Sequence, residues 1–213
     1  MENKIHCGDA LELLGKLEIC PDLIIVSPPD LAETHFSFDE YREFLGKTII
    51  GCANVLRVGG VLASATTDRR LNGMIYTKHK DILTHMENIG WQPFHYKIWA
   101  KPRKIDLMIP TFVHIICFRK AKTKTLQNNI HDFLPDVWDL PLDKVAGYKN
   151  KDSFPSELVR RLVLKFTNEG DLVLDPFIGT GKTAVVCNEL NRRWIGFELD
   201  PSIVSLANSR LSV

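Results

Sequence analysis

The chain has 213 residues, of which 45% are hydrophobic and 25% are charged, and its formal net charge is +1 at pH 7. This length and composition are typical of one globular domain, and they exclude a collagen-like, disordered or disulfide-dense chain. No apolar run approaches the roughly 20 residues that a transmembrane helix needs, and the N-terminus lacks the pattern of a signal peptide. The five cysteines are scattered without a Cys-x-x-Cys pair, which predicts reduced thiols in a cytoplasmic protein.

Predicted strands and helices alternate along most of the chain. The strands are short apolar runs, and the helices carry apolar residues three or four positions apart. In chain order we predict strand 4–7, a helix from Asp9, strand 23–26, helix 39–56, strand 61–64, helix 80–88, strands 94–100 and 112–118, helix 153–167, strand 172–174, helix 182–190, strand 194–197 and helix 201–211. This alternation predicts an α/β fold with a doubly wound, mostly parallel sheet.

Two of the predicted strands end in segments with the composition of ligand-binding loops. Strand 23–26 is followed by Ser27-Pro28-Pro29-Asp30, and strand 172–174 is followed by a glycine-containing segment, residues 175–183. In open α/β sheets, ligands bind beyond the carboxyl ends of the strands. Prolines stiffen the first loop, and glycines in the second let the backbone approach a ligand closely.

The second loop has the features of a nucleotide-cofactor site. Asp175 ends one strand, and Glu198 ends the next at a spacing suited to bonding ribose hydroxyls. A P-loop ATPase would need a glycine where Pro176 stands, and a Rossmann dehydrogenase would need a third glycine where Ala184 stands. The remaining alternative is a tight turn that binds nothing.

The Ser-Pro-Pro loop, residues 154–158 and residues 170–200 together resemble the amino-group DNA methyltransferases that use S-adenosylmethionine. Because the catalytic segment precedes the cofactor segment, the chain resembles their permuted β class. The resemblance covers nearly the whole chain and implies a Rossmann-like methyltransferase fold with a small target-recognition insert. It implies a single domain, 1–213, with a catalytic half (1–100), an insert (about 103–148) and a cofactor-binding half (about 150–213).

The resemblance also implies a set of cofactor-binding residues. In the family pattern Asp9 contacts the adenine amine, while Phe154 and Phe177 line the pocket. The full implied set is Asp9, Ala10, Phe154, Asp175, Pro176, Phe177, Gly179, Thr180, Gly181, Thr183, Glu198, Leu199 and Asp200. Lys182 departs from the family, which usually has a small hydroxyl residue there. A lysine beside a cationic cofactor is unfavourable unless its side chain points to solvent or to phosphate.

The resemblance assigns catalysis to the loop Ser27, Pro28, Pro29 and Asp30. An exocyclic base amine is a poor nucleophile. Ser27 Oγ and the Pro28 carbonyl oxygen are suited to accept hydrogen bonds from its two N–H groups. The target nucleotide would be flipped out of the duplex. Asp30 departs from the family, in which an aromatic residue usually stacks on the base. We favour a stack from another aromatic, with a modified base or an inactive enzyme as alternatives; the candidates are Phe36, Phe38, Tyr41, Trp99 and Tyr148.

Basic residues are concentrated in the middle of the chain. Residues 69–124 contain 12 Lys+Arg and 3 Asp+Glu, whereas the rest contains 15 and 23. This imbalance favours a polyanion partner, although a solvated basic face would give the same count. The candidate phosphate contacts are Arg69, Arg70, Lys101, Arg103 and Lys104, with further basic residues at Lys97 and in 119–124.

The predicted function is site-specific methylation of an exocyclic amine in double-stranded DNA. Because a serine heads the loop, the resemblance favours cytosine N4 slightly over adenine N6. A catalytically silent cofactor-binding or DNA-binding subunit and an RNA-directed amine methyltransferase are the alternatives. A cognate restriction endonuclease and a homodimer are compatible with the resemblance. We expect no membrane partner, because the chain lacks a long apolar run. We also expect no metal, because the seven histidines show no metal-ligand spacing.

Overall fold

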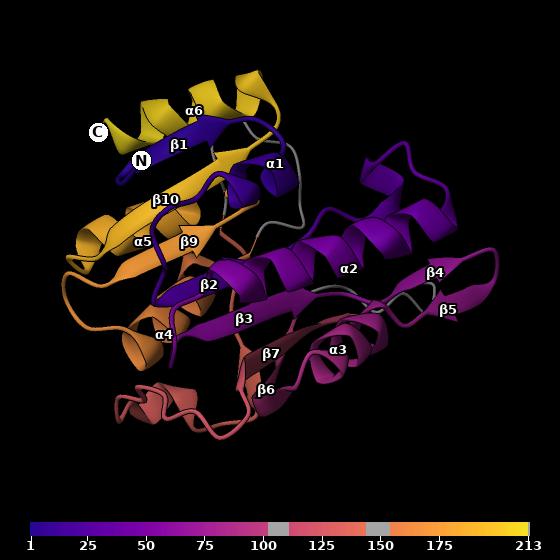
Figure 1. Cartoon of the computed structure of the whole chain (residues 1–213), viewed down its shortest axis with the longest axis horizontal. Coiled ribbons are helices and arrows are strands. Elements are labelled where there is room, and N and C mark those ends of the chain that lie inside the picture. Colours follow the sequence, from indigo (N-terminus) through magenta and orange to yellow (C-terminus); the bar gives the residue numbers. More distant parts are fainter. Residues whose placement is uncertain (102–110, 144–153, 213) are drawn as a thin grey trace.

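The computed structural model describes residues 1–101, 111–143 and 154–212, and eight strands form its central sheet (Figure 1). In their order across the sheet the strands are β1 (Lys4–Cys7), β10 (Arg193–Glu198), β9 (Leu172–Asp175), β2 (Leu23–Val26), β3 (Val61–Thr66), β7 (Phe112–Lys120), β6 (Trp91–Ala100) and β8 (Val137–Asp139). Every pairing is parallel except those of β7 with β3 and with β6. The predicted α/β fold with a mostly parallel sheet is confirmed.

Helices cover both faces of the sheet (Figure 1). Residues of β2 alternate between the two sides, since Leu23 and Ile25 belong to one apolar cluster and Ile24 and Val26 to the other. A strand buried on both faces reads as a continuous apolar run, which is why its sequence shows no alternation. One layer contains α1 (Ala10–Gly15), α2 (Phe38–Val55) and α3 (Lys78–Asn88), and the other contains α4 (Ser156–Phe166), α5 (Lys182–Glu189) and α6 (Pro201–Leu211).

Local sequence signals define the starts of α2 and α6. Ser37 caps α2 and forms a capping box with Glu40, and Asp200 caps α6 just before Pro201. The predicted α4 is wrong at its beginning, because Pro155 is extended (φ −64°, ψ 142°) and the helix starts at Ser156. Two short 3-10 helices, Leu31–Glu33 and His131–Phe133, complete the main elements. No helix within the described ranges is long and apolar enough to cross a membrane.

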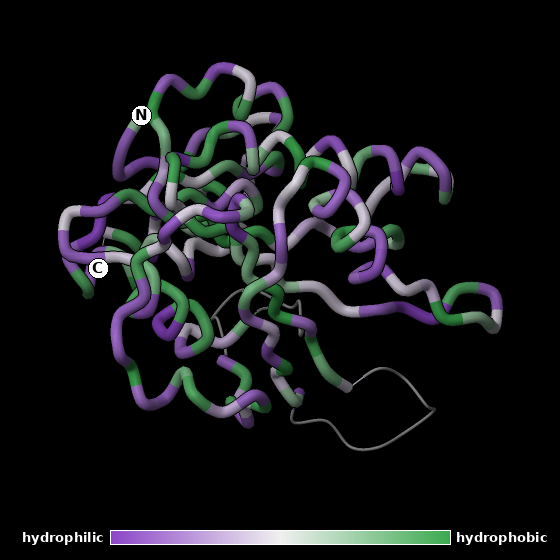
Figure 2. Tube along the Cα trace, turned by 60° about the horizontal axis from the view of Figure 1, so that its bottom comes forward, coloured by the Kyte–Doolittle hydropathy of each residue, from purple (hydrophilic) through white to green (hydrophobic). Residues whose placement is uncertain are grey.

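A small hairpin projects from the body of the protein, and the sequence analysis did not predict it (Figures 1 and 2). It consists of β4 (Arg69–Leu71) and β5 (Met74–Tyr76). Between them, Asn72 (φ 49°) and Gly73 (φ 82°) take the left-handed conformations of a two-residue hairpin turn. The Asn-Gly pair was an available signal, but the flanking strands have only three residues each. At the tip, Met74 and Ile75 are exposed.

Candidate active site

A cavity of about 650 Å³ lies where the order of the strands reverses, between β9 and β2. From β9 the chain winds outward through β10, and from β2 it winds the other way through β3. Both loops then leave adjacent parallel strands at the same edge, so residues 27–30 and 175–180 line one cavity. A crevice at this switch point is the usual ligand site of open α/β sheets.

Nearly all of the predicted cofactor-binding residues line this cavity. They are Asp9, Ala10, Phe154, Asp175, Pro176, Phe177, Gly179, Thr180, Thr183, Glu198, Leu199 and Asp200. Gly181 does not line it. Gly181 is left-handed (φ 81°) at the N-cap of α5, and a Cβ there would lie 3.3 Å from Ala207 Cβ. Its absence of a side chain therefore serves the turn and the packing of α6.

Asp175 is a buried carboxylate at the end of β9. It accepts hydrogen bonds from Thr183 Oγ1 at 2.5 Å and from the Phe177 amide at 3.0 Å. Burial raises the pKa of Asp175 to about 6, more than these two hydrogen bonds lower it, and the nearby Glu198 raises it further. The site thus holds negative charge that is poorly solvated and that a cation would stabilise.

Two further acidic residues at the cavity, Asp9 and Glu198, also organise its backbone. Asp9 caps α1 by accepting from the amides of Leu11 and Glu12, as its predicted place near the N-cap required. Glu198 Oε1 accepts from the Asp200 amide at 2.9 Å. Each of these carboxylates is therefore held in orientation by hydrogen bonds to its own neighbours in the chain.

Lys182 is buried at the base of the cavity rather than pointing to solvent or phosphate. Its Nζ donates to the carbonyl oxygen of Phe154 at 2.6 Å and lies 3.4 Å from Asp143 Oδ2. Burial lowers the pKa of Lys182, although Asp143 opposes this. Asp143 also accepts from Ser156 N and Oγ at 2.5 Å. The lysine thus anchors the segment that carries Phe154, and its charge is partly balanced.

The Ser-Pro-Pro loop is braced from α2. The Tyr41 hydroxyl donates to the carbonyl oxygen of Pro29 at 2.8 Å, and its ring is fully buried. Ser27, Pro28, Pro29 and Asp30 all line the cavity. A rigid loop with its acceptors at a cavity wall is preorganised to bind hydrogen-bond donors.

Asp30 does not face the cavity as an unpaired charge. Lys78 Nζ lies 2.5 Å from Asp30 Oδ1, and Arg69 Nε donates to Oδ2 at 2.7 Å. Although burial raises the pKa of Asp30, the ammonium of Lys78 and the guanidinium of Arg69 together lower it below its usual value. Asp30 is also the N-cap residue of the 3-10 helix Leu31–Glu33. Lys78, only 3% exposed, was not among the predicted site residues.

The aromatic candidates for stacking on a base are placed differently. Trp99 is fully buried and donates to the Leu140 carbonyl, and Tyr41 is buried under the loop. Phe38 packs edge-to-face on Tyr76 outside the cavity lining. Phe36 lines the cavity, is 42% exposed and packs against Phe44. Tyr148 lies outside the described residues.

The basic residues of the middle segment do not form one surface. Lys101 lines the cavity and is buried, and Arg70 is exposed on the β4–β5 hairpin. Lys97, by contrast, is buried and pairs with Asp136 at 2.8 Å. Residues 119–124 comprise the last two residues of β7 and those after it, near the start of β3 and at the end of the strands opposite the cavity. Arg103 and Lys104 lie outside the described residues.

The family model described as DNA methylase (N6_N4_Mtase) matches residues 21–209, which include both loops. This chain belongs to that family. The match confirms the predicted resemblance and the enzyme class. Among relatives, the orphan methyltransferase M.BamHII of Bacillus amyloliquefaciens is 37% identical over 89% of this chain and 88% of its own length. M.HpaI of Haemophilus parainfluenzae, a type II methyltransferase, is 26% identical over 99% of this chain and 74% of its own length.

Solved structures agree with the fold. TTHA0409 of Thermus thermophilus, a candidate DNA modification methylase, was solved in complex with S-adenosyl-L-methionine, the predicted cofactor. It superposes with a TM-score of 0.79 at 27% identity over 98% of this chain and 93% of its own. The cytosine-N4-specific PvuII methyltransferase, at 19% identity and a TM-score of 0.85, supports the fold alone. The chain spans 63% of the length of M.MjaI of Methanocaldococcus jannaschii and 54% of that of M.BamHI.

Proposed function

We propose that the chain transfers a methyl group from S-adenosylmethionine to an exocyclic amine of a flipped-out base in double-stranded DNA. Cytosine N4 is favoured over adenine N6 because Ser27 heads the loop. The observation that carries the proposal is the shared cavity of about 650 Å³ that the Ser-Pro-Pro loop and the Asp175 loop both line. This volume falls within the range of small-molecule sites, and the two reactants must meet for direct transfer.

The residues around Asp175 fit the proposed cofactor. S-adenosylmethionine supplies the methyl group as a substituent of a sulfonium cation. The buried carboxylate of Asp175 and the nearby carboxylate of Glu198 lower the free energy of a cation placed near them. Phe154 and Phe177 offer apolar surface for an adenine ring, and Gly179 lets the backbone approach closely. The cavity-lining set given above, without Gly181, is the binding site we propose.

The proposed catalytic step needs only acceptors held in place. Ser27 Oγ and the carbonyl oxygen of Pro28 accept hydrogen bonds from the two N–H groups of the base amine and favour a pyramidal nitrogen. Tyr41 fixes the loop through Pro29, so little reorganisation is needed during transfer. The nitrogen forms its bond to carbon as the sulfur–carbon bond breaks, and the amine proton is lost to water. No metal ion is required for this step.

We assign the stack on the flipped base to Phe36, the candidate that is both exposed and at the cavity. Asp30 then has a different role. Its pairing with Lys78 and Arg69 anchors the loop, so its presence does not require the silent-subunit alternative. Arg70, Lys101 and the residues Arg103 and Lys104 remain the proposed DNA contacts, and the β4–β5 hairpin carries Arg70 towards the duplex.

Two further assignments complete the proposal. We expect a cytoplasmic setting, which the five free cysteines support. We also keep the single-domain assignment, although the described part of the proposed insert (about 103–148) includes β7 and β8 of the main sheet.

The relatives named above include an orphan and a type II methyltransferase. Co-expression with a candidate endonuclease and light scattering test for a restriction partner and for a homodimer.

The deciding experiment is tritiated methyl transfer from S-adenosylmethionine to mixed-sequence unmethylated DNA, with the nucleosides identified by mass spectrometry. We expect label in N4-methylcytosine, whereas label in N6-methyladenine would show that the target base is adenine. Ser27→Ala, with its expected loss of rate, serves as the low-activity control. Label on RNA alone would replace the DNA proposal, and cofactor binding without any transfer would favour the silent subunit.

A further inference from the structure

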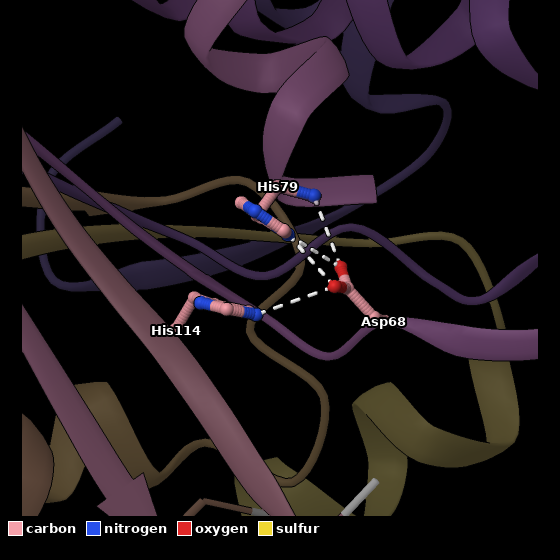
Figure 3. A group of neighbouring side chains, drawn as sticks. All are labelled: Asp68, His79 and His114. Atoms are coloured by element: carbon pink, nitrogen blue, oxygen red, sulfur yellow. Dashed lines mark hydrogen bonds and ion pairs between the residues drawn. The ribbon is translucent and has the colours of Figure 1, made fainter. Parts of the chain in front are cut away.

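Three side chains that come from separate parts of the sequence, those of Asp68, His79 and His114, converge in the structure (Figure 3). Asp68 follows β3, His79 lies in the first turn of α3, and His114 lies on β7 opposite Thr66. One nitrogen or oxygen from each residue lies within 4.8 Å of the others. No spacing in the sequence signals this group, because it is assembled from three separate elements.

The distances between these atoms suit a shared ligand. His79 Nδ1 lies 2.8 Å from Asp68 Oδ2, and His114 Nε2 lies 3.4 Å from the same oxygen. Two ligand atoms bound tetrahedrally to one zinc ion, each about 2.1 Å from it, are roughly 3.4 Å apart. The cluster thus needs only a small adjustment to surround an ion.

The protein satisfies the His114 ring incompletely. His114 is 5% exposed, and its Nε2 reaches Asp68 Oδ2 at 3.4 Å, which is longer than a well-formed hydrogen bond. Buried polar groups usually have a closer partner, so an ion shared with the carboxylate would improve the environment of this nitrogen. The other ring nitrogen, Nδ1, bonds to the Tyr96 hydroxyl. A second partner on Nδ1 is how proteins orient a metal-binding histidine and leave Nε2 for the ion.

The donor set selects the class of ion. Two imidazoles and one carboxylate suit zinc, cobalt or nickel, whereas magnesium and calcium prefer oxygen ligands alone. Arg69 and Lys78, which are next to Asp68 and His79 in the chain, bond to the carboxylate of Asp30. The rings of His79 and His114 are stacked with centroids 4.0 Å apart, so both bring a nitrogen to the same carboxylate.

We propose that Asp68, His79 and His114 bind a borderline divalent transition-metal ion, with zinc as the expected occupant and a fourth position open to water. This proposal departs from the expectation, based on histidine spacing in the sequence, that no metal is bound. The ion would stabilise the structure and take no part in methyl transfer. Arg69 follows Asp68 and Lys78 precedes His79, and both hold Asp30. An ion joining β3, α3 and β7 would fix the two residues that anchor the catalytic loop.

The test is titration of the full, chelator-treated chain with Co²⁺, followed by visible absorption, and then competition with Zn²⁺. Cys7 and Cys20 are exposed free thiols, so every variant is built on the Cys7→Ser, Cys20→Ser background. We expect one Co²⁺ per chain, d–d absorption bands displaced by Zn²⁺, and affinity at least tenfold weaker in His79→Ala and His114→Ala. His95→Ala is the matched control, because His95 is also partly buried but bonds to Gln127.

Thermal unfolding provides the second measurement. Zinc should raise the melting temperature of the background protein and of His95→Ala, but not of His79→Ala, because only native protein with all three ligands binds the ion tightly. His79 is 24% exposed at its side chain, so its variant should fold even if His114→Ala does not. Equal cobalt affinity in the background and in His79→Ala would overturn the proposal, and so would the absence of stoichiometric binding.

Discussion

The proposed cofactor side of the cavity and its proposed catalytic side are built by different means. Around Asp175 most stabilising bonds join residues within eight positions, such as Phe177 and Thr183 to Asp175, or Asp200 to Glu198. Asp30 bonds locally to Glu33, but the ion pairs of its carboxylate come from Arg69 and Lys78, which are 39 and 48 positions away. The first kind of site is visible in a short motif, whereas the second exists only when distant elements pack together.

The strongest test of this difference is Lys78→Met. The change removes a buried partner of Asp30, and breaking a buried ion pair from one side costs about 3 kcal/mol or more. We expect the free energy of unfolding to fall by about 3 kcal/mol in urea denaturation, with a loss of methyl transfer. Lys80→Met on the exposed face of α3 is the control. An equally small effect of both variants would show that the anchor is dispensable.

Ser27→Ala tests the catalytic side without disturbing the cofactor side. Removing one preorganised polar group at a reacting centre reduces the rate by about 100-fold. We expect that loss in single-turnover methyl transfer, while calorimetry shows the same Kd for S-adenosylmethionine as in the unchanged protein. Weaker binding of S-adenosylmethionine together with an unchanged rate would show that Ser27 contacts the cofactor and not the base amine.

The pH dependence of cofactor binding tests the charge of Asp175. Its folded pKa of about 6 lies above the ordinary value of 3.8, so its contribution to folding stability is complete below 3.8 and is lost as the pH rises through about 6. Binding of a cationic cofactor becomes stronger as the pH rises through the pKa, because the cation is stabilised by the deprotonated Asp175 carboxylate. We expect the Kd for S-adenosylmethionine to be about tenfold weaker at about pH 5, one unit below the pKa, than at about pH 7. Asp175→Asn should flatten this difference.

The smallest expected effect concerns DNA. Arg70→Ala removes one exposed charge from the hairpin beside the catalytic loop, so the slope of log affinity against log salt should decrease by about one. Lys124→Ala, at the end of the strands opposite the cavity, should leave the slope unchanged. Equal slopes for the two variants in fluorescence anisotropy would remove the hairpin from the DNA interface.

Some elements could be predicted with nearly the observed bounds. Helix α6 begins at Pro201 as predicted, because Asp200 and Pro201 form a local start signal. The hairpin at Asn72-Gly73 was missed, since strands of three residues show no periodicity. Gly181 was assigned to the cofactor on its motif, yet it does not line the cavity, and a Cβ at this position would meet Ala207. A glycine in a motif can serve the ligand or the packing, and the sequence does not distinguish them.

The sequence by itself determined the family, the alternation of strands and helices, and the two loops that meet at the cavity. These depend on local chemistry: apolar runs, caps, prolines and glycines act within a few residues. Only the tertiary structure decided the partners of Asp30, the burial of Lys97 and Lys182, and the cluster of Asp68, His79 and His114. Those depend on which elements become neighbours across the sheet, and the register of β3, β7 and α3 brings such residues within a few ångströms of one another.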